Sequence, residues 1–149
     1  MPNDALLALV KAQQEQERDP DYVPSTVDLA MLMLRTQGFP EAATTKAKPM
    51  GRFMKWVLRE PLAATNPLTG NVQYNEGLMR SLPRNEIVDT MAHELTHTRQ
   101  VANTPWYKRP FAYTAQTATP YRQRPWEQEA YGVEAERRAA RRDIQLPSK

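Results

Sequence analysis

Apolar residues recur at helical spacing in the first quarter of the chain, and this pattern predicts two helices. The first is expected over residues 3–18 as a surface helix with one apolar stripe. The second is expected to begin at the run Ser25–Asp28, which resembles a capping box, and to end at Gly38 as its C′ residue. We expect its apolar run Met31–Leu34 to lie in the core.

The middle of the chain contains the only pattern that favours a strand. Residues Phe53–Leu58 fit a short helix or a strand, and the helix is the preferred interpretation. Residues 66–71 are rich in turn-forming types, and Val72–Asn75 alternates apolar and polar positions as a half-buried strand does. One strand-and-turn element is therefore expected before residue 84.

The best-defined apolar stripe of helical period covers residues 84–101 and consists of Ile87, Val88, Met91, Ala92 and Leu95. The segment 103–124 carries three prolines and five aromatic residues, and it is expected to form a long irregular loop. A last helix is expected over Trp126–Asp143, directly after Pro125. The predicted fold class is therefore mainly α (α+β), a helical domain with a short strand element before the helix at 84–101.

Composition narrows the class of protein further. The 149 residues are enough for one domain, which we expect to span 1–149. The chain has no cysteine, which excludes disulfides and thiolate metal ligands. The N-terminal residues have neither the basic start nor the long apolar run of a targeting or membrane-spanning segment, so we expect a cytoplasmic protein without a membrane partner.

The two histidines of the chain, His93 and His97, lie four positions apart with Glu94 between them. On a helix this spacing directs both imidazoles toward one point, and HExxH is the arrangement of a zinc hydrolase. Both histidines fall on the side of the helix opposite the apolar stripe. Asp89 or Thr90, one turn earlier, is expected to orient an imidazole by accepting its second N–H.

A catalytic zinc ion needs three protein ligands and an open fourth position. Because the chain has no further histidine and no cysteine, the third ligand must be a carboxylate. The last helix offers four glutamates after a loop long enough to bring it back antiparallel. They are Glu127, Glu129, Glu134 and Glu136, of which Glu127 and Glu134 share one helix face.

The motif resembles that of the zincin metallopeptidases, in particular the gluzincin branch, in which a glutamate on a following helix completes HExxH. The run Ala92–His97 matches the first element, and Glu127–Tyr131 is similar to the second, which in many members reads Glu-x-x-Ala followed by Asp or Asn. The resemblance implies a minimal single-domain zincin with Glu127 as the third zinc ligand. Tyr131 stands where Asp is common, and Glu129 remains an alternative ligand.

The implied activity is zinc-dependent hydrolysis of a peptide bond in a protein or peptide substrate. Glu94, beside the histidine face, would be the general base that takes a proton from water and passes it to the leaving amine. The tetrahedral intermediate also needs a hydrogen-bond donor, and the candidates by position are Tyr113, Tyr121 and Arg122.

Two other classes of function stay open at this point. The first is a catalytically silent scaffold or interaction protein of zincin fold, as a component of a larger assembly. The second is a nucleic-acid surface, since basic and aromatic residues are interleaved after residue 105. The arginines at 137–142 alternate with alanines on a helix that also carries Glu134, which favours a solvated helix face over nucleic-acid binding.

Overall fold

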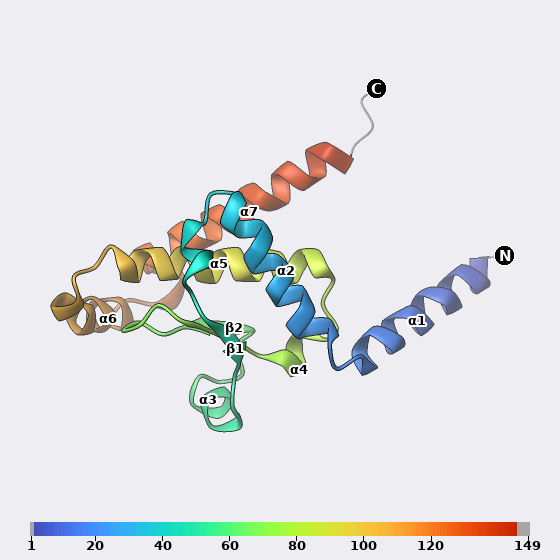
Figure 1. Ribbon diagram of the computed structural model, residues 1–149, viewed down its shortest axis with the longest axis horizontal. Coiled ribbons are helices and arrows are strands. Elements are labelled where there is room, and N and C mark those ends of the chain that lie inside the picture. Colours follow the sequence, from blue (N-terminus) through green and yellow to red (C-terminus); the bar gives the residue numbers. More distant parts are fainter. Residues whose placement is uncertain (1, 146–149) are drawn as a thin grey trace.

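The structure is a computed structural model that describes residues 2–145 (Figure 1). Its elements in chain order are α1 (Pro2–Arg18), α2 (Tyr22–Thr36), η1 (Pro40–Ala43), β1 (Ala47–Pro49), α3 (Arg52–Val57), β2 (Ala63–Thr65), β3 (Val72–Tyr74), α4 (Glu76–Met79), α5 (Arg84–Ala102), η2 (Trp106–Lys108), α6 (Arg109–Thr117), η3 (Tyr121–Gln123) and α7 (Pro125–Gln145). The chain is mainly helical with one small sheet, which confirms the predicted fold class.

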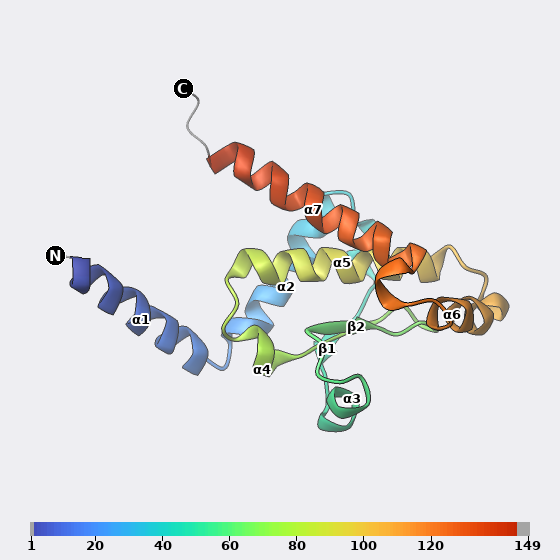
Figure 2. The ribbon, with the colours of Figure 1, turned by 180° about the vertical axis from the view of Figure 1, so that it is seen from behind.

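Helix α5 is the centre of the fold, with α2, α7 and the sheet packed around it (Figures 1 and 2). Twelve of its 19 residues are buried, including charged and polar ones, so α5 is enclosed on nearly all sides. Its apolar stripe belongs to the main hydrophobic core, where it meets one face of α2. The core residues of α2 recur at helical spacing and are Val23, Val27, Ala30 and Leu34.

The sheet has three short strands in the order β1–β3–β2. Strand β1 pairs parallel to β3, and β2 pairs antiparallel to it, so β2 forms one edge. The predicted strand at 72–75 and the predicted helix at 53–58 are confirmed. The expectation of a single strand was wrong, because β1 and β2 are only three residues long and contain the weak strand formers Ala, Lys and Pro.

The predicted start of α2 was wrong, and its predicted end was correct. It begins at Tyr22, and Ser25 lies inside the first turn with its hydroxyl donating to the Tyr22 carbonyl, so no capping box forms. At the other end Gly38 has a φ of +98°, and the Phe39 N–H donates to the Leu34 carbonyl at 3.0 Å. This is a Schellman ending with Gly38 at C′, as predicted.

Only part of the run Met31–Leu34 reaches the core. Leu34 is fully buried and Met31 packs against the cluster, but Leu32 is 63% exposed and Met33 is 37% exposed. Consecutive helical residues point in different directions, so four apolar residues in a row cannot all face one side.

The segment 103–124 is not the irregular loop that the sequence suggested. It contains η2, α6 and η3, and its three prolines lie at the starts of these helices. Pro105 and Pro120 are N-cap residues, and Pro110 is in the first turn of α6. Proline has no N–H to donate, and the first turn of a helix does not need one, so these prolines start helices here.

Helix α1 extends away from the rest of the structure (Figures 1 and 2). It is attached through Gln13 and Gln16, whose amides donate to backbone carbonyls of residues 80–82. Its apolar residues are exposed, in agreement with the expected surface helix. Within residues 2–145, no helix combines the length and the apolar character required to cross a membrane.

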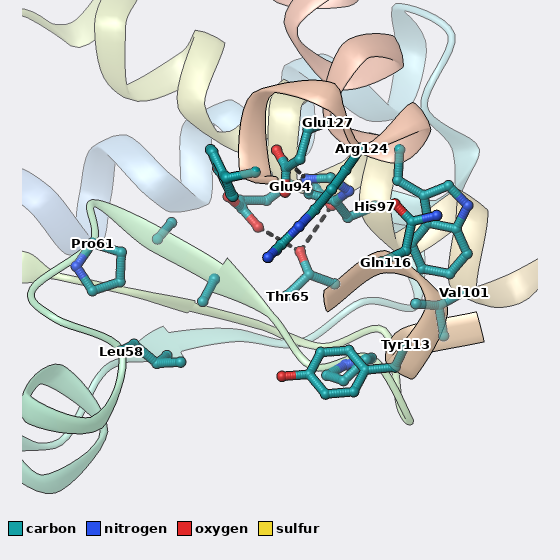
Figure 3. A pocket seen from close by; sticks show the side chains of 15 residues that line it. Leu58, Pro61, Thr65, Glu94, His97, Val101, Tyr113, Gln116, Arg124 and Glu127 are labelled. Atoms are coloured by element: carbon teal, nitrogen blue, oxygen red, sulfur yellow. Dashed lines mark hydrogen bonds and ion pairs between the residues drawn. The ribbon is translucent and has the colours of Figure 1, made fainter. Parts of the chain in front are cut away.

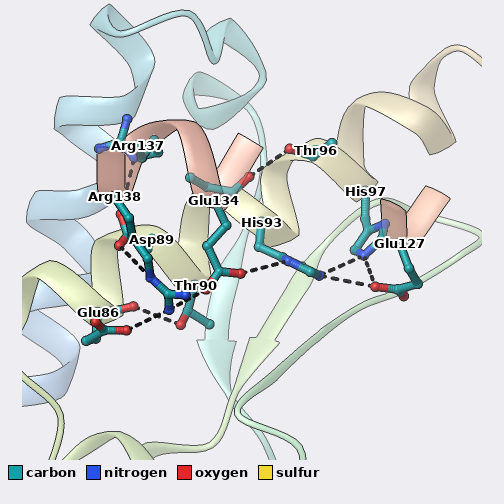
Figure 4. A network of polar contacts seen from close by, with 11 residues as sticks. Glu86, Asp89, Thr90, His93, Thr96, His97, Glu127, Glu134, Arg137 and Arg138 are labelled. Carbon is teal, nitrogen blue, oxygen red and sulfur yellow. Dashed lines mark hydrogen bonds and ion pairs between the residues drawn. The ribbon is translucent and has the colours of Figure 1, made fainter. Parts of the chain in front are cut away.

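A buried ion-pair cluster joins α5 to α7 (Figure 4). The Asp89 side chain on α5 has no solvent exposure. It accepts hydrogen bonds from Arg141 at 2.7 Å and from Arg137 at 3.4 Å, and Arg138 lies 3.8 Å away. Because the three arginines come from two adjacent turns of α7, Asp89 fixes the position of this helix along α5.

We predict that Asp89→Ala destabilises the protein, because it leaves three guanidinium groups at the helix interface without their shared acceptor. The arginines are partly exposed, so we expect a loss of about 2–4 kcal/mol in the free energy of unfolding, somewhat below the cost at a fully buried pair. Urea unfolding in the presence of a chelator measures it. The exposed α7 variant Glu136→Ala is the control and should change stability by less than about 0.5 kcal/mol. Equal stability of the two variants would contradict the prediction.

Candidate metal centre

Helices α5 and α7 run antiparallel, and their facing polar side chains form the candidate site. Contacts pair residues in opposite order along the two helices: Gln100 with Trp126, His97 with Glu127, His93 with Glu134, and Asp89 with Arg141. The predicted common face of Glu127 and Glu134 therefore meets both histidines.

The proposed ligand atoms form a nearly equilateral triangle (Figure 4). The Nε2 atoms of His93 and His97 are 3.2 Å apart, and Glu127 Oε2 lies 3.3 Å from each. In tetrahedral zinc sites the metal–ligand bonds are about 2.0–2.1 Å, which separates neighbouring ligand atoms by about 3.3–3.4 Å. The three atoms thus have the spacing of one face of a zinc tetrahedron, and the donor set fits the ion that the sequence predicted.

The second nitrogen of each imidazole determines where its proton lies. His93 Nδ1 is 3.3 Å from Glu134 Oε2, and an ionised carboxylate can only accept a hydrogen bond. His97 Nδ1 is 2.8 Å from the Gln100 carbonyl oxygen, Oε1. The Gln100 amide nitrogen donates to Glu129 Oε2 at 2.6 Å and to the Trp126 carbonyl, which fixes the orientation of the amide.

In the neutral imidazoles both Nδ1 atoms are therefore donors, and both Nε2 atoms present lone pairs. These two lone pairs and the Glu127 carboxylate converge on one point. Three acceptors that face one another need a cation or additional protons between them, and a divalent metal supplies the charge without a proton.

The electrostatics of the site follow from burial and from these contacts. When no metal is bound, an imidazole Nε2 can carry a proton and donate it to Glu127. Burial alone would raise the pKa of Glu127, but these hydrogen bonds with His93 and His97 outweigh burial and hold the pKa well below its usual range. Burial alone would lower the pKa of His97, but its hydrogen bond to Glu127 and the nearby charge of Glu94 raise it above 6.5. Protons therefore compete with a metal for His97.

Glu94 is placed beside the triangle without belonging to it. Its side chain is nearly buried, and burial raises the pKa of its carboxyl group despite the charge of His97 and the hydrogen bond from Thr65. The Thr65 hydroxyl lies 2.6 Å from Glu94 Oε2 and 3.1 Å from the Glu94 backbone carbonyl. A raised pKa brings a carboxylate closer to the value that suits a general base near neutral pH.

The predicted orienting role of Asp89 or Thr90 was wrong. Asp89 binds the arginines of α7, and the Thr90 hydroxyl donates to the Glu86 carbonyl within its own helix. The residues that hold the imidazoles are Glu134 and Gln100, which the sequence analysis did not assign to this role. A signal existed for each, since Glu134 shares the face of Glu127 and Gln100 follows His97 by three residues.

Glu129, the alternative third ligand, does not lie at the triangle. Its carboxylate accepts the hydrogen bond from Gln100, so it supports His97 indirectly. Tyr131 packs edge-on against the His93 ring with centroids 4.7 Å apart. The carboxylate partner of His93 is Glu134, which lies one turn after Tyr131.

A cleft of about 330 Å³ opens beside the triangle (Figure 3). Glu94, His97 and Glu127 line it, together with the strand β2 and residues of α6, η3 and α7. Tyr113 and Tyr121 also line it, while the side chain of Arg122 lies outside the described residues. Burial and a hydrogen bond with Tyr131 raise the pKa of Tyr121, so its phenol keeps the proton that a donor needs.

We predict that Glu134→Gln weakens zinc binding by about tenfold or more, because the neutral amide polarises the His93 imidazole less than a carboxylate does. Competition with a chromogenic chelator measures the dissociation constant. Glu136→Gln is the control. Glu136 is exposed and lies two residues after Glu134, so this substitution removes the same charge from α7 and should leave the dissociation constant unchanged. Equal constants for both variants would show that Glu134 does not support the metal.

Comparisons with protein-family models, with curated proteins and with solved structures found no match to this chain.

Proposed function

We propose that the protein is a zinc-dependent peptidase, a minimal gluzincin-like enzyme in which His93, His97 and Glu127 hold the metal. The observation that carries the proposal is the triangle of three acceptor atoms at 3.2–3.3 Å, with a buried carboxylate beside it at the wall of an open cleft. Three metal ligands, an adjacent general base and a cleft for the substrate are the groups that metal-assisted hydrolysis requires.

In this proposal zinc, when bound, lowers the pKa of water and polarises the scissile carbonyl group. Glu94 accepts the proton from the attacking water through its carboxylate and delivers it to the leaving amine. Thr65 keeps the Glu94 carboxylate in place through its 2.6 Å hydrogen bond. Tyr121, whose phenol stays protonated, donates a hydrogen bond to the developing oxyanion.

The edge strand β2 supports a peptide as the substrate. On the side of β3, the Leu62 carbonyl accepts a hydrogen bond from the Asn75 N–H at 2.7 Å, and the Asn66 N–H donates to the Asn71 carbonyl at 2.8 Å. Since backbone groups alternate sides along an antiparallel strand, Ala63 and Thr65 direct theirs away from β3. The cleft runs along β2, so an extended peptide that pairs with these groups would lie beside Glu94.

The nucleic-acid alternative is less well supported. The arginines of α7 that suggested it, Arg137, Arg138 and Arg141, form ion pairs with Asp89 and with other carboxylates of α5 and α7. A silent scaffold remains the second candidate, because the same triangle could hold a structural ion. A cytoplasmic location is part of the proposal and is based on the cysteine-free sequence.

We expect the protein, purified without a histidine tag, to contain close to one zinc ion per chain. Two variants on the same helix test the ligand set: Glu127→Gln should lose the metal, while Glu129→Gln should keep it, since only Glu127 reaches the triangle. His97→Ala should also lose it. Elemental analysis after dialysis measures the zinc content, and zinc-free wild-type protein would reject the metal centre.

Glu94→Gln separates an enzyme from a scaffold. The variant should keep its zinc, because Glu94 is not a ligand, and should lose about 10²–10⁴-fold in turnover, the range for removal of a general base. Mass spectrometry of a mixed peptide pool measures cleavage by both proteins. No cleavage by wild-type protein would favour the scaffold, and equal cleavage by both would remove Glu94 from the mechanism.

A further inference from the structure

Among the described residues that line the cleft, Arg124 is the only arginine or lysine. It is the last residue before α7, and its backbone is extended, with φ −65° and ψ 126°, as is usual for a residue that precedes proline. Figure 3 shows its long side chain directed across the cleft that Glu94, His97 and Glu127 also line.

Two contacts hold the guanidinium group in this orientation. Its Nε donates to the Thr119 carbonyl at 2.9 Å, and its central carbon lies 5.3 Å from the centroid of the Tyr121 ring. The first contact is made by Nε, and the second is made by the planar face of the guanidinium group. They leave the terminal nitrogens Nη1 and Nη2, with their four N–H donors, without a hydrogen-bond partner among the described residues.

Most other partly buried arginines of the described structure bind a carboxylate. Arg99, Arg137 and Arg141 each form an ion pair with a carboxylate of a neighbouring element. Arg109 instead donates from both Nε and Nη1 to backbone carbonyls. The two carboxylates in the cleft are already engaged, Glu94 by Thr65 and Glu127 by the imidazoles. The terminal donors of Arg124 thus have no anionic partner within the described part of the protein, although they lie in a cleft with largely apolar walls.

We propose that Arg124 binds a carboxylate of the substrate and that the peptidase selects peptides with a negative charge close to the cleaved bond. This inference rests on the proposed function and adds the substrate class to it. A guanidinium group with two free terminal nitrogens matches a carboxylate in a bidentate arrangement. The carboxylate belongs to an Asp or Glu side chain or to the C-terminus of the peptide.

A single negative charge fits the charge balance of the cleft. Zinc held by two neutral imidazoles and Glu127 would carry one net positive charge, which an ionised Glu94 would cancel. Arg124 then contributes one uncompensated positive charge. A dianion such as a phosphate group would place a second negative charge near Glu94 and Glu127 without another basic residue to compensate it.

Binding to the zinc-loaded Glu94→Gln protein tests the proposal without requiring turnover. The immobilised protein is mixed with a pool of random octapeptides, and the retained peptides are quantified by mass spectrometry. We expect peptides with a carboxylate to be enriched about 10-fold to 100-fold over their amide counterparts, the range for one charge-assisted hydrogen-bonded pair. The additional substitution Arg124→Gln should abolish this enrichment, while Lys108→Gln, outside the cleft, should preserve it.

Two matched pools distinguish the sources of the carboxylate. If enrichment disappears when all C-termini are amidated, the protein reads the end of a chain. If it disappears only when Asp and Glu are replaced by Asn and Gln, the protein reads a side chain. Equal enrichment with and without Arg124, or stronger retention of phosphopeptides than of acidic peptides, would overturn the proposal.

The outcome also separates this proposal from the hydrolase itself. Arg124-dependent retention of acidic peptides by a protein whose wild-type form cleaves nothing would support recognition and reject hydrolysis. Cleavage with no preference for acidic peptides would support hydrolysis and reject the recognition of a carboxylate by Arg124. Zinc content and circular dichroism verify that Arg124→Gln is folded. If it does not fold, Arg124→Lys replaces it, and undiminished discrimination by that variant would reject the bidentate pairing.

Discussion

The antiparallel contact between α5 and α7 is the interaction on which the rest of the structure depends. It is a polar interface, in which Asp89, His93, His97 and Gln100 of α5 each meet a partner on α7. Removing such groups from water is costly unless each finds a partner with good geometry. The pairing therefore tolerates only one alignment of the two helices, and that alignment brings Glu127 to the histidines.

The site also depends on the sheet, although the sheet is small. Strand β2 packs on α5 and carries Thr65, which bonds both the side chain and the backbone carbonyl of Glu94. The same strand forms a wall of the cleft. One three-residue strand thus positions the proposed base and bounds the proposed substrate site, which explains why so little β-structure is enough for this arrangement.

The sequence predicted those features that depend on local periodicity or on a rare residue. The positions of α5 and α7, the HExxH face and the pairing of Glu127 with Glu134 on one face all follow from helical spacing. The contributions of Thr65 and Arg124 could not be predicted, because Thr65 bonds a residue 29 positions away and the role of Arg124 depends on the shape of the cleft. The helices within 103–124 could not be predicted from its prolines, because proline starts helices as readily as it ends them.

The shortness of β2 limits what the proposed enzyme could read from a substrate backbone. Three residues span about 10 Å of extended chain, and only two of them direct their backbone groups outward. A partner segment would gain few main-chain hydrogen bonds there and would have to be locally unfolded to form them. Discrimination between targets would then depend on individual side chains and on chain accessibility, so that intact globular domains would resist cleavage while exposed tails and loops would be the natural points of attack.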